Sequence, residues 1–208
     1  MIVQHNIASM NANRQLGIVG NNLAKATEKL SSGYRINRAA DDAAGLSISE
    51  KMRGQVRGLQ RASDNAQDGI SLIQTAEGAM DQQHAILQRA RELAVQAAND
   101  TNVTEDRNAI SEELTQLKQE FDRIKDQTEF NTQKLLDGSF KDKNFQVGAN
   151  NGQNIAVSIS TTTMTDISGN VTTYAAATAA IETINGNITA LSTSRSKLGA
   201  IQNRLEYT

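Results

Sequence analysis

An uninterrupted seven-residue repeat of apolar side chains is the feature that most constrains how this chain can fold. Such a repeat keeps one apolar edge on the same side of an α-helix for as long as it lasts. Nothing forces the helix to stop, because the 208 residues include no proline. We therefore expect one helix over residues 42–99, roughly 85 Å long at about 1.5 Å per residue. The repeat consists of Met52, Leu59, Ala66, Ile73, Met80, Leu87 and Ala94.

A helix of that length predicts an elongated rod, since a compact globule of this chain length has a radius of gyration of about 17 Å. Five glycines lie inside the predicted helix, and each costs up to about 1 kcal/mol relative to alanine. Close approach of a neighbouring element would compensate for this cost; the alternative is that one or two glycines mark breaks. The five are Gly45, Gly54, Gly58, Gly69 and Gly78.

Another helix is predicted before the long one, over residues 7–30. Its stripe ends at Ser31-Ser32-Gly33, where the glycine can take the left-handed conformation that often closes a helix. Asp41 and Asp42 suit the start of the long helix, because carboxylates favour the positive end of the helix dipole. The stripe consists of Leu16, Val19, Leu23, Ala26 and Leu30.

Two more helices are predicted after the long one. One covers residues 104–128, and the short polar turn before it makes it an antiparallel neighbour of the long helix. The other runs from about residue 174 to the end of the chain without a stop signal, which predicts that the chain is truncated. The expected helix-packing seam comprises Met52, Leu59, Ile73, Met80 and Leu87 with Ile110, Leu114, Leu117, Phe121 and Ile124.

A small β-hairpin is expected within about residues 140–159. Apolar and polar residues alternate over 144–147 and 155–159, and Asn151-Gly152 between them is a strong turn signal. Residues 130–139 look irregular, and 160–173, rich in Thr, Ser and Gly, are expected to form a short exposed loop. The fold class is thus mainly α, an elongated rod of long antiparallel helices with a hairpin region. We expect a helical segment over 1–40 and a rod domain over 41–159 and 174–208.

Composition excludes several classes of function. The absence of cysteine rules out disulfides and thiolate metal sites, and two histidines are too few for a histidine zinc site. A net charge of −2 argues against nucleic-acid binding; the basic ridge of Arg53, Arg57 and Arg61 has no interleaved aromatic residues. No apolar run reaches the roughly 20 residues of a membrane helix. No nucleophile–base pair is visible, so we expect no enzyme, metal or cofactor.

Long strings of this sequence resemble bacterial flagellins. They are SSGYRINRAADDAAGLSISEKMRGQVRGL (31–59), DGISLIQTAEGAM (68–80), LQRARELAVQAAN (87–99) and EFNTQKLLDG (129–138), with SRSKLGAIQNRLE (194–206) similar to the start of the C-terminal region. The resemblance covers about 1–159 and 175–208. A variable domain usually interrupts such chains near 161–174, and here it is nearly absent. Family members also continue beyond the position of Thr208 with a further helical segment.

The resemblance implies a structural subunit that polymerises with its own copies into the extracellular flagellar filament, for motility. It further implies export without a cleavable signal peptide and folding assisted by the flagellar export and capping proteins. Because the C-terminal helical segment is missing, the stripe of the first helix would lack its partner. We therefore expect these 208 residues alone to assemble poorly.

The resemblance also implies a receptor site. In many flagellins the stretch around Arg89 is recognised by the innate immune receptor Toll-like receptor 5. Arg89 would supply several hydrogen-bond donors, Leu93 an apolar knob and Glu113 a complementary charge, with Glu92 and Gln96 beside them. From the residues alone, Leu93 packing against a neighbouring helix is the favoured alternative.

Two other functions remain open. A hook–filament junction protein would share the helical ends, although residues 37–53 and 87–96 favour flagellin proper. The second possibility is a truncated receptor ligand, which would signal but would not polymerise. Filament formation would discriminate the polymer from the ligand.

Overall fold

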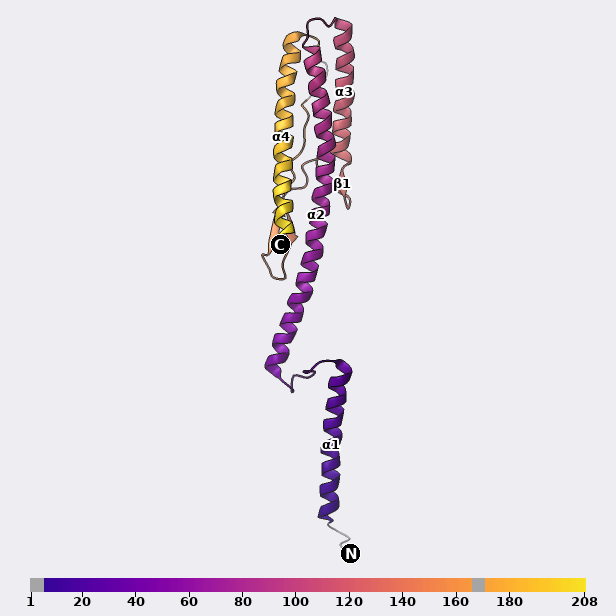
Figure 1. The fold of residues 1–208 in the computed structure, drawn as a ribbon, viewed down its shortest axis with the longest axis vertical. Coiled ribbons are helices and arrows are strands. Elements are labelled where there is room, and N and C mark those ends of the chain that lie inside the picture. The colour runs from indigo at the N-terminus through magenta and orange to yellow at the C-terminus, as the bar shows by residue number, and fades with distance from the viewer. Residues whose placement is uncertain (1–5, 166–170) are drawn as a thin grey trace. The chain divides into compact units, whose positions relative to one another are not determined.

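The computed structural model describes residues 6–165 and 171–208, which contain four helices and two small antiparallel strand pairs (Figure 1). The mainly α fold class is therefore confirmed, and the long helix is continuous from Ala43 to Ala97 without a break at any glycine. Contacts divide the chain into two units, Met1–Arg57 and Gly58–Thr208. The helices are α1 (Ile7–Ser32), α2 (Ala43–Ala97), α3 (Thr104–Gln127) and α4 (Tyr174–Glu206).

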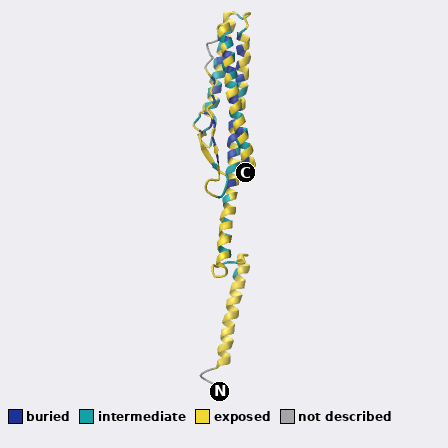
Figure 2. Cartoon of the chain, turned by 90° about the vertical axis from the view of Figure 1, so that its left-hand side faces the viewer, coloured by how far each residue is buried: buried dark blue, intermediate teal, exposed yellow. Residues whose placement is uncertain are grey.

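Helix α1 has well-formed ends but no buried residue. The Asn6 side chain accepts a hydrogen bond from the Ser9 backbone N–H at 3.1 Å, and Gly33 closes the helix with φ of 70°. The side of α1 that carries its apolar stripe is exposed along its length (Figure 2). The stripe predicted from the sequence therefore exists, but it is not covered within this chain.

The two aspartates before α2 have different tasks. Asp42 Oδ1 accepts a hydrogen bond from the Gly45 N–H at 2.8 Å and so caps the first turn of α2. Asp41 Oδ2 accepts from the backbone of Asn37 and Arg38, each at 3.4 Å. Asp42 thus starts the helix as expected, whereas Asp41 stabilises the connector.

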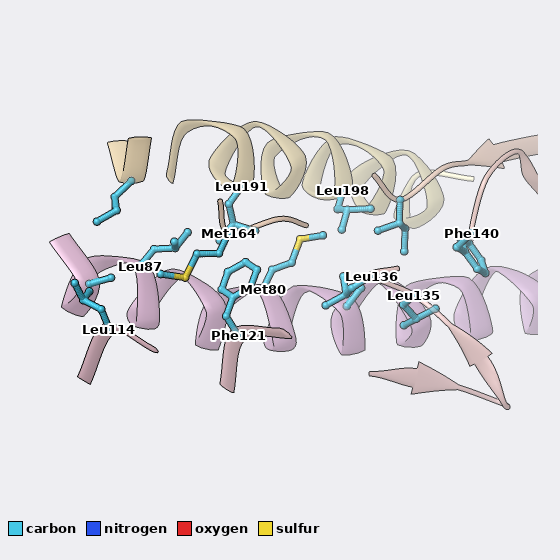
Figure 3. Packing of buried hydrophobic residues seen from close by; sticks show 14 of the residues in the cluster. Met80, Leu87, Leu114, Phe121, Leu135, Leu136, Phe140, Met164, Leu191 and Leu198 are labelled. Carbon is cyan, nitrogen blue, oxygen red and sulfur yellow. The ribbon is translucent and has the colours of Figure 1, made fainter. Parts of the chain in front are cut away.

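The core belongs to the second unit, where α3 and α4 lie beside α2 and run antiparallel to it (Figure 1). Most of the predicted seam is buried there: Ile73, Met80, Leu87, Ile110, Leu114 and Phe121, with Leu117 and Ile124 half-buried against it. The close view in Figure 3 shows Met80 and Leu87 pointing from α2 toward α4, and Leu191 pointing from α4 toward α2.

Two members of the predicted seam are not covered. Met52 is 60% exposed and Leu59 is 54% exposed, although both continue the spacing of Met80 and Leu87. A seven-residue repeat marks which edge of a helix is apolar, but it does not say how far along that edge a partner extends. Among the residues described, burial along α2 begins at Ala62.

Two hairpins complete the second unit. The predicted hairpin forms from β3 (Lys143–Gln146) and β4 (Asn154–Val157), with Phe145 opposite Ile155. Residues 130–139 are less irregular than expected, because β1 (Glu129–Phe130) pairs with β2 (Gln133–Lys134). Asn131 and Thr132, both with positive φ, make the tight turn between them.

The segment predicted as an exposed loop over 160–173 is partly buried. Thr162 and Met164 are 5% exposed and Val171 is fully buried, while residues 166–170 lie outside the described part. Figure 3 shows Met164 reaching into the core between Leu87 and Leu191. A Thr- and Ser-rich composition predicted exposure, but the isolated apolar residues within it are long enough to fill space between helices.

Candidate functional site

Arg89 joins two helices on the surface of the second unit. It lies on α2, and its Nε and Nη2 atoms donate hydrogen bonds to Glu113 Oε1 on α3 at 3.0 and 2.9 Å. Its Nη1 atom donates to Glu92 Oε2, one turn along α2, at 3.2 Å. Residues three apart share a helix face, and α3 returns antiparallel beside them. The structure therefore brings together Arg89, Glu92 and Glu113, the three charged residues that the family resemblance assigns to a receptor site.

This cluster remains accessible to a partner. Side-chain exposure is 52% for Arg89 and 45% for Glu113. A guanidinium carries five N–H donors, and the three hydrogen bonds described use three of them. Hydrogen bonds from Arg89, chiefly to Glu113 and then to Glu92, raise the pKa of the guanidinium above its ordinary value. Arg89 is thus a permanently charged donor held in one direction.

Leu93 does not form the exposed knob predicted beside Arg89. It is 2% exposed and belongs to the hydrophobic core, so the favoured alternative from the residues, packing within the bundle, is what the structure shows. Residues four apart differ by only about 40° around a helix, so Arg89 lies at the edge of the exposed side of α2, and this small rotation places Leu93 on the buried side. Its contribution to the surface is to fix the backbone beneath Arg89.

Gln96 lies one turn beyond Leu93, with an exposed side chain near the end of α2. Its backbone carbonyl accepts a hydrogen bond from Asn102 Nδ2 at 2.5 Å. Arg107, on α3, donates from Nε to the Ala97 carbonyl at 3.2 Å and pairs with Asp100 at 3.0 Å. These bonds satisfy carbonyl groups that a helix end leaves free, and they fix the turn that places α3 beside α2.

Sequence reasoning missed two residues of this region. In the sequence, Arg107 looks like an ordinary charged helix residue. Its hydrogen bond to the Ala97 carbonyl and its salt bridge with Asp100 exist only once the turn between α2 and α3 has formed. Val95 is 53% exposed near Glu92, and no helical stripe includes it. The position of Val95 outside every apolar stripe could have predicted that its side chain is exposed.

The surface around Arg89 presents one guanidinium, two carboxylates, an amide and the exposed apolar side chain of Val95. Over the described residues no group of three metal-ligating side chains comes together. Likewise, none of the helices described is long and apolar enough to span a membrane.

Comparison with known proteins identifies related chains. The family described as the bacterial flagellin N-terminal helical region matches residues 3–141. A flagellin of Halalkalibacterium halodurans is 55% identical to this chain over 213 residues. The match covers 100% of this chain and 78% of that flagellin. The flagellar filament 33 kDa core protein of Treponema phagedenis is 43% identical over 227 residues, covering 100% of this chain and 79% of that protein.

A solved structure supports the same relationship. The crystal structure of Bacillus cereus flagellin superposes with a TM-score of 0.63 at 31% sequence identity. The superposition covers 70% of this chain and 86% of that one. Most of this fold is therefore shared with a protein whose structure was determined by experiment.

Proposed function

The chain belongs to the bacterial flagellin family, and we propose that it acts as a structural subunit of the extracellular flagellar filament. The observation that carries this proposal is α1, a helix of 26 residues with no buried residue. Its exposed apolar side chains include Leu16, Val19, Leu23 and Leu30. An isolated helix with such a stripe is marginal in water, and covering each leucine is worth about 1.5–3 kcal/mol. Packing against neighbouring subunits would provide that cover.

Co-assembly tests the filament role. The labelled chain is mixed with monomeric Halalkalibacterium halodurans flagellin under assembly conditions, and incorporation is measured by sedimentation and electron microscopy. We expect the chain to enter the filaments, and the double variant Leu16→Lys with Leu23→Lys to stay in the supernatant. Asn21→Lys, on the side of α1 opposite the apolar stripe, is the matched control and should enter normally. Exclusion of the unmodified chain to the same extent as the double variant would refute the role.

Export in an unfolded form and folding at the filament tip with capping proteins are part of this proposal. The composition supports it, because the chain has neither cysteine nor proline. No disulfide could hold the chain in a folded form before export, and no X–Pro bond has to isomerise afterwards. Such isomerisation takes tens of seconds or longer, roughly 10–100 s at 25 °C. A chain of this composition can refold as fast as its helices pack.

We also infer that the surface around Arg89 is recognised by Toll-like receptor 5. Support comes from the exposed Arg89–Glu113 pair, with two guanidinium N–H donors left for a partner. Glu92, Gln96 and Val95 surround the pair with polar and apolar contacts. Leu93 contributes through packing beneath the surface, which changes the role predicted for it.

Receptor binding by variants of the full chain tests this assignment. Arg89→Ala should weaken binding to the receptor ectodomain by about tenfold or more, the effect expected when a central arginine is truncated. Arg123→Ala is a matched control, because Arg123 is also exposed and pairs with Glu120 at 2.5 Å. It should bind as the unmodified chain does.

An exchanged pair separates recognition from stability. In Arg89→Glu with Glu113→Arg, the two helices keep a salt bridge while the charges shown to a partner are reversed. We expect unfolding in urea to resemble that of the unmodified chain, with binding still lost. Full binding by both the exchanged pair and Arg89→Ala would remove the assignment.

A further inference from the structure

Two Asn-Gly pairs occupy very different backbone settings in this chain. Asn151-Gly152 lies in the turn of the β3–β4 hairpin, and Asn185-Gly186 lies inside α4. We propose that Asn151 is a site of spontaneous deamidation in the folded protein, whereas α4 protects Asn185 from the same reaction. Both sites consist of an asparagine followed by a glycine, so we attribute the difference in reactivity to the structure around them.

The reaction needs only the chain and water. The backbone nitrogen of Gly152 loses its proton to solvent and attacks the Asn151 side-chain carbonyl carbon, and ammonia leaves. The resulting cyclic imide is hydrolysed by one water molecule. Opening at the side-chain carbonyl gives aspartate, and opening at the backbone carbonyl gives isoaspartate. The net change is addition of water and loss of ammonia, with no oxidant or cofactor.

The turn leaves Asn151 and Gly152 free to reach this geometry. Both residues are exposed, and Gly152 has φ of 81°, a conformation in which glycine is not strained. They are the central residues of a turn closed by a 3.4 Å hydrogen bond from the Gln153 N–H to the Asn150 carbonyl. Within the described residues, neither the Asn151 side chain nor the Gly152 N–H has a hydrogen-bond partner. The attacking nitrogen is therefore open to solvent.

In α4 the same pair is held away from this geometry. The Gly186 N–H belongs to the helical ladder, and the Asn185 carbonyl additionally accepts a hydrogen bond from Thr189 Oγ1 at 2.9 Å. The backbone at Asn185 cannot rotate without breaking the helix. Steric crowding does not explain the difference, because a Cβ at Gly186 would meet nothing within 4 Å. Protection at Asn185 comes from the fixed, hydrogen-bonded backbone.

Deamidation would alter a turn that several side chains stabilise. Gln146 Nε2 donates to the carbonyls of Gly148 and Asn150 at 2.7 and 2.8 Å. The Asn150 N–H donates to Gln153 Oε1 at 2.8 Å. Isoaspartate adds a methylene to the backbone between these residues, and either product adds a negative charge. In the isoaspartate product the turn would lose the backbone spacing on which this network depends.

The test compares both asparagines in the full chain during incubation at mildly alkaline pH. Cleavage after Glu182 separates the two sites into different peptides, and tandem mass spectrometry locates the amide-to-acid conversion. We expect Asn151 to convert at least about tenfold faster than Asn185, since a helix interior reacts only after opening at a free-energy cost. Asn151→Gln should remove the signal at that site.

The same measurement in concentrated urea supplies the reference for local sequence effects. There both pairs are unfolded, and the ratio of the two rates should fall toward unity. A ratio in the folded chain clearly above the ratio in urea supports the proposal. A ratio in the folded chain no larger than that in urea overturns it.

Discussion

Leu93 and Val95 lie two positions apart on α2, yet Leu93 is 2% exposed and Val95 is 53% exposed. Each residue turns a helix by about 100°, so a separation of two places side chains on nearly opposite sides. The apolar character of both residues is visible in the sequence. Which of them faces the core depends on where α3 and α4 lie. The residues alone favoured a packed Leu93, and only the family resemblance placed it on the surface.

We predict that Leu93→Ala lowers the free energy of unfolding by about 2–5 kcal/mol, since it leaves a cavity in a packed core. Val95→Ala should change it by less than about 0.5 kcal/mol, because it removes exposed surface only. Urea unfolding followed by circular dichroism measures both. Equal effects of the two substitutions would contradict the burial assigned to Leu93.

Gln83 shows that the periodicity of apolar residues does not predict every buried position. It is fully buried on α2, and its Nε2 atom donates a hydrogen bond to the Phe121 carbonyl on α3 at 3.3 Å. A polar residue outside the seam is expected on a solvated face. The contact with α3 satisfies the Nε2 atom of this amide, which periodicity along α2 does not reveal.

Asp122 makes the stability of α3 depend on pH. Burial alone would raise the pKa of its carboxyl, but hydrogen bonds from Lys118 at 2.8 Å and Lys125 at 3.2 Å lower it below the ordinary 3.8. Stability from a lowered pKa is present above the unfolded value and is lost as pH falls through the folded value. We predict that Asp122→Asn makes unfolding less sensitive to acid than in the unmodified chain. Urea unfolding at neutral pH and below pH 3.8 tests this; parallel losses in both proteins would count against it.

At the scale of elements, most of the architecture follows from sequence periodicity. The helices predicted over 42–99 and 104–128 form as Ala43–Ala97 and Thr104–Gln127. Their stripes and the missing proline are local features, so local reasoning is sufficient. The pairing of Arg89 with Glu113 is not local. It depends on the register between antiparallel helices, which the turn after α2 sets, and the sequence supplied it only through family resemblance.

The glycines of α2 differ in how closely other parts of the chain approach them. A Cβ at Gly58 would lie 2.8 Å from the Cβ and 3.2 Å from the Cα of Ala149, and one at Gly69 would lie 3.2 Å from Phe145. The predicted close approach therefore holds at these two positions. It fails at Gly54 and Gly78, where nothing lies within 4 Å.

We predict opposite effects of alanine at two of these glycines. Gly78→Ala should raise the free energy of unfolding by about 0.5–1 kcal/mol, the helix-propensity gain at an open site. Gly58→Ala should instead lower it, because the loop holding Ala149 must move away from the helix. Urea unfolding of the two variants gives the comparison.

A compensating substitution tests the cause at Gly58. Adding Ala149→Gly to Gly58→Ala removes the contacting Cβ and should recover part of the loss. If Ala149→Gly gives no recovery, or if Gly58→Ala stabilises as much as Gly78→Ala, the close approach is not what requires glycine there.

On the scale of the whole molecule, the two units differ in how they are stabilised. Within the described residues of Met1–Arg57 none is buried, whereas Gly58–Thr208 holds the hydrophobic core. Without core contacts a helix depends on its own propensity and caps, which sustain only marginal stability. The first unit should therefore open far more often than the second.

Limited proteolysis with trypsin should reveal this difference. We predict early cleavage at exposed basic residues of α1, such as Arg14, Lys25 and Lys29, because cleavage requires local opening of the helix. Arg91 and Arg123 are equally exposed but lie on helices anchored in the core, so they should be cut much later. Mass spectrometry of a time course identifies each site. Cleavage at Arg91 as early as at Arg14 would mean that α2 opens as readily as α1, which burial of twelve α2 residues argues against.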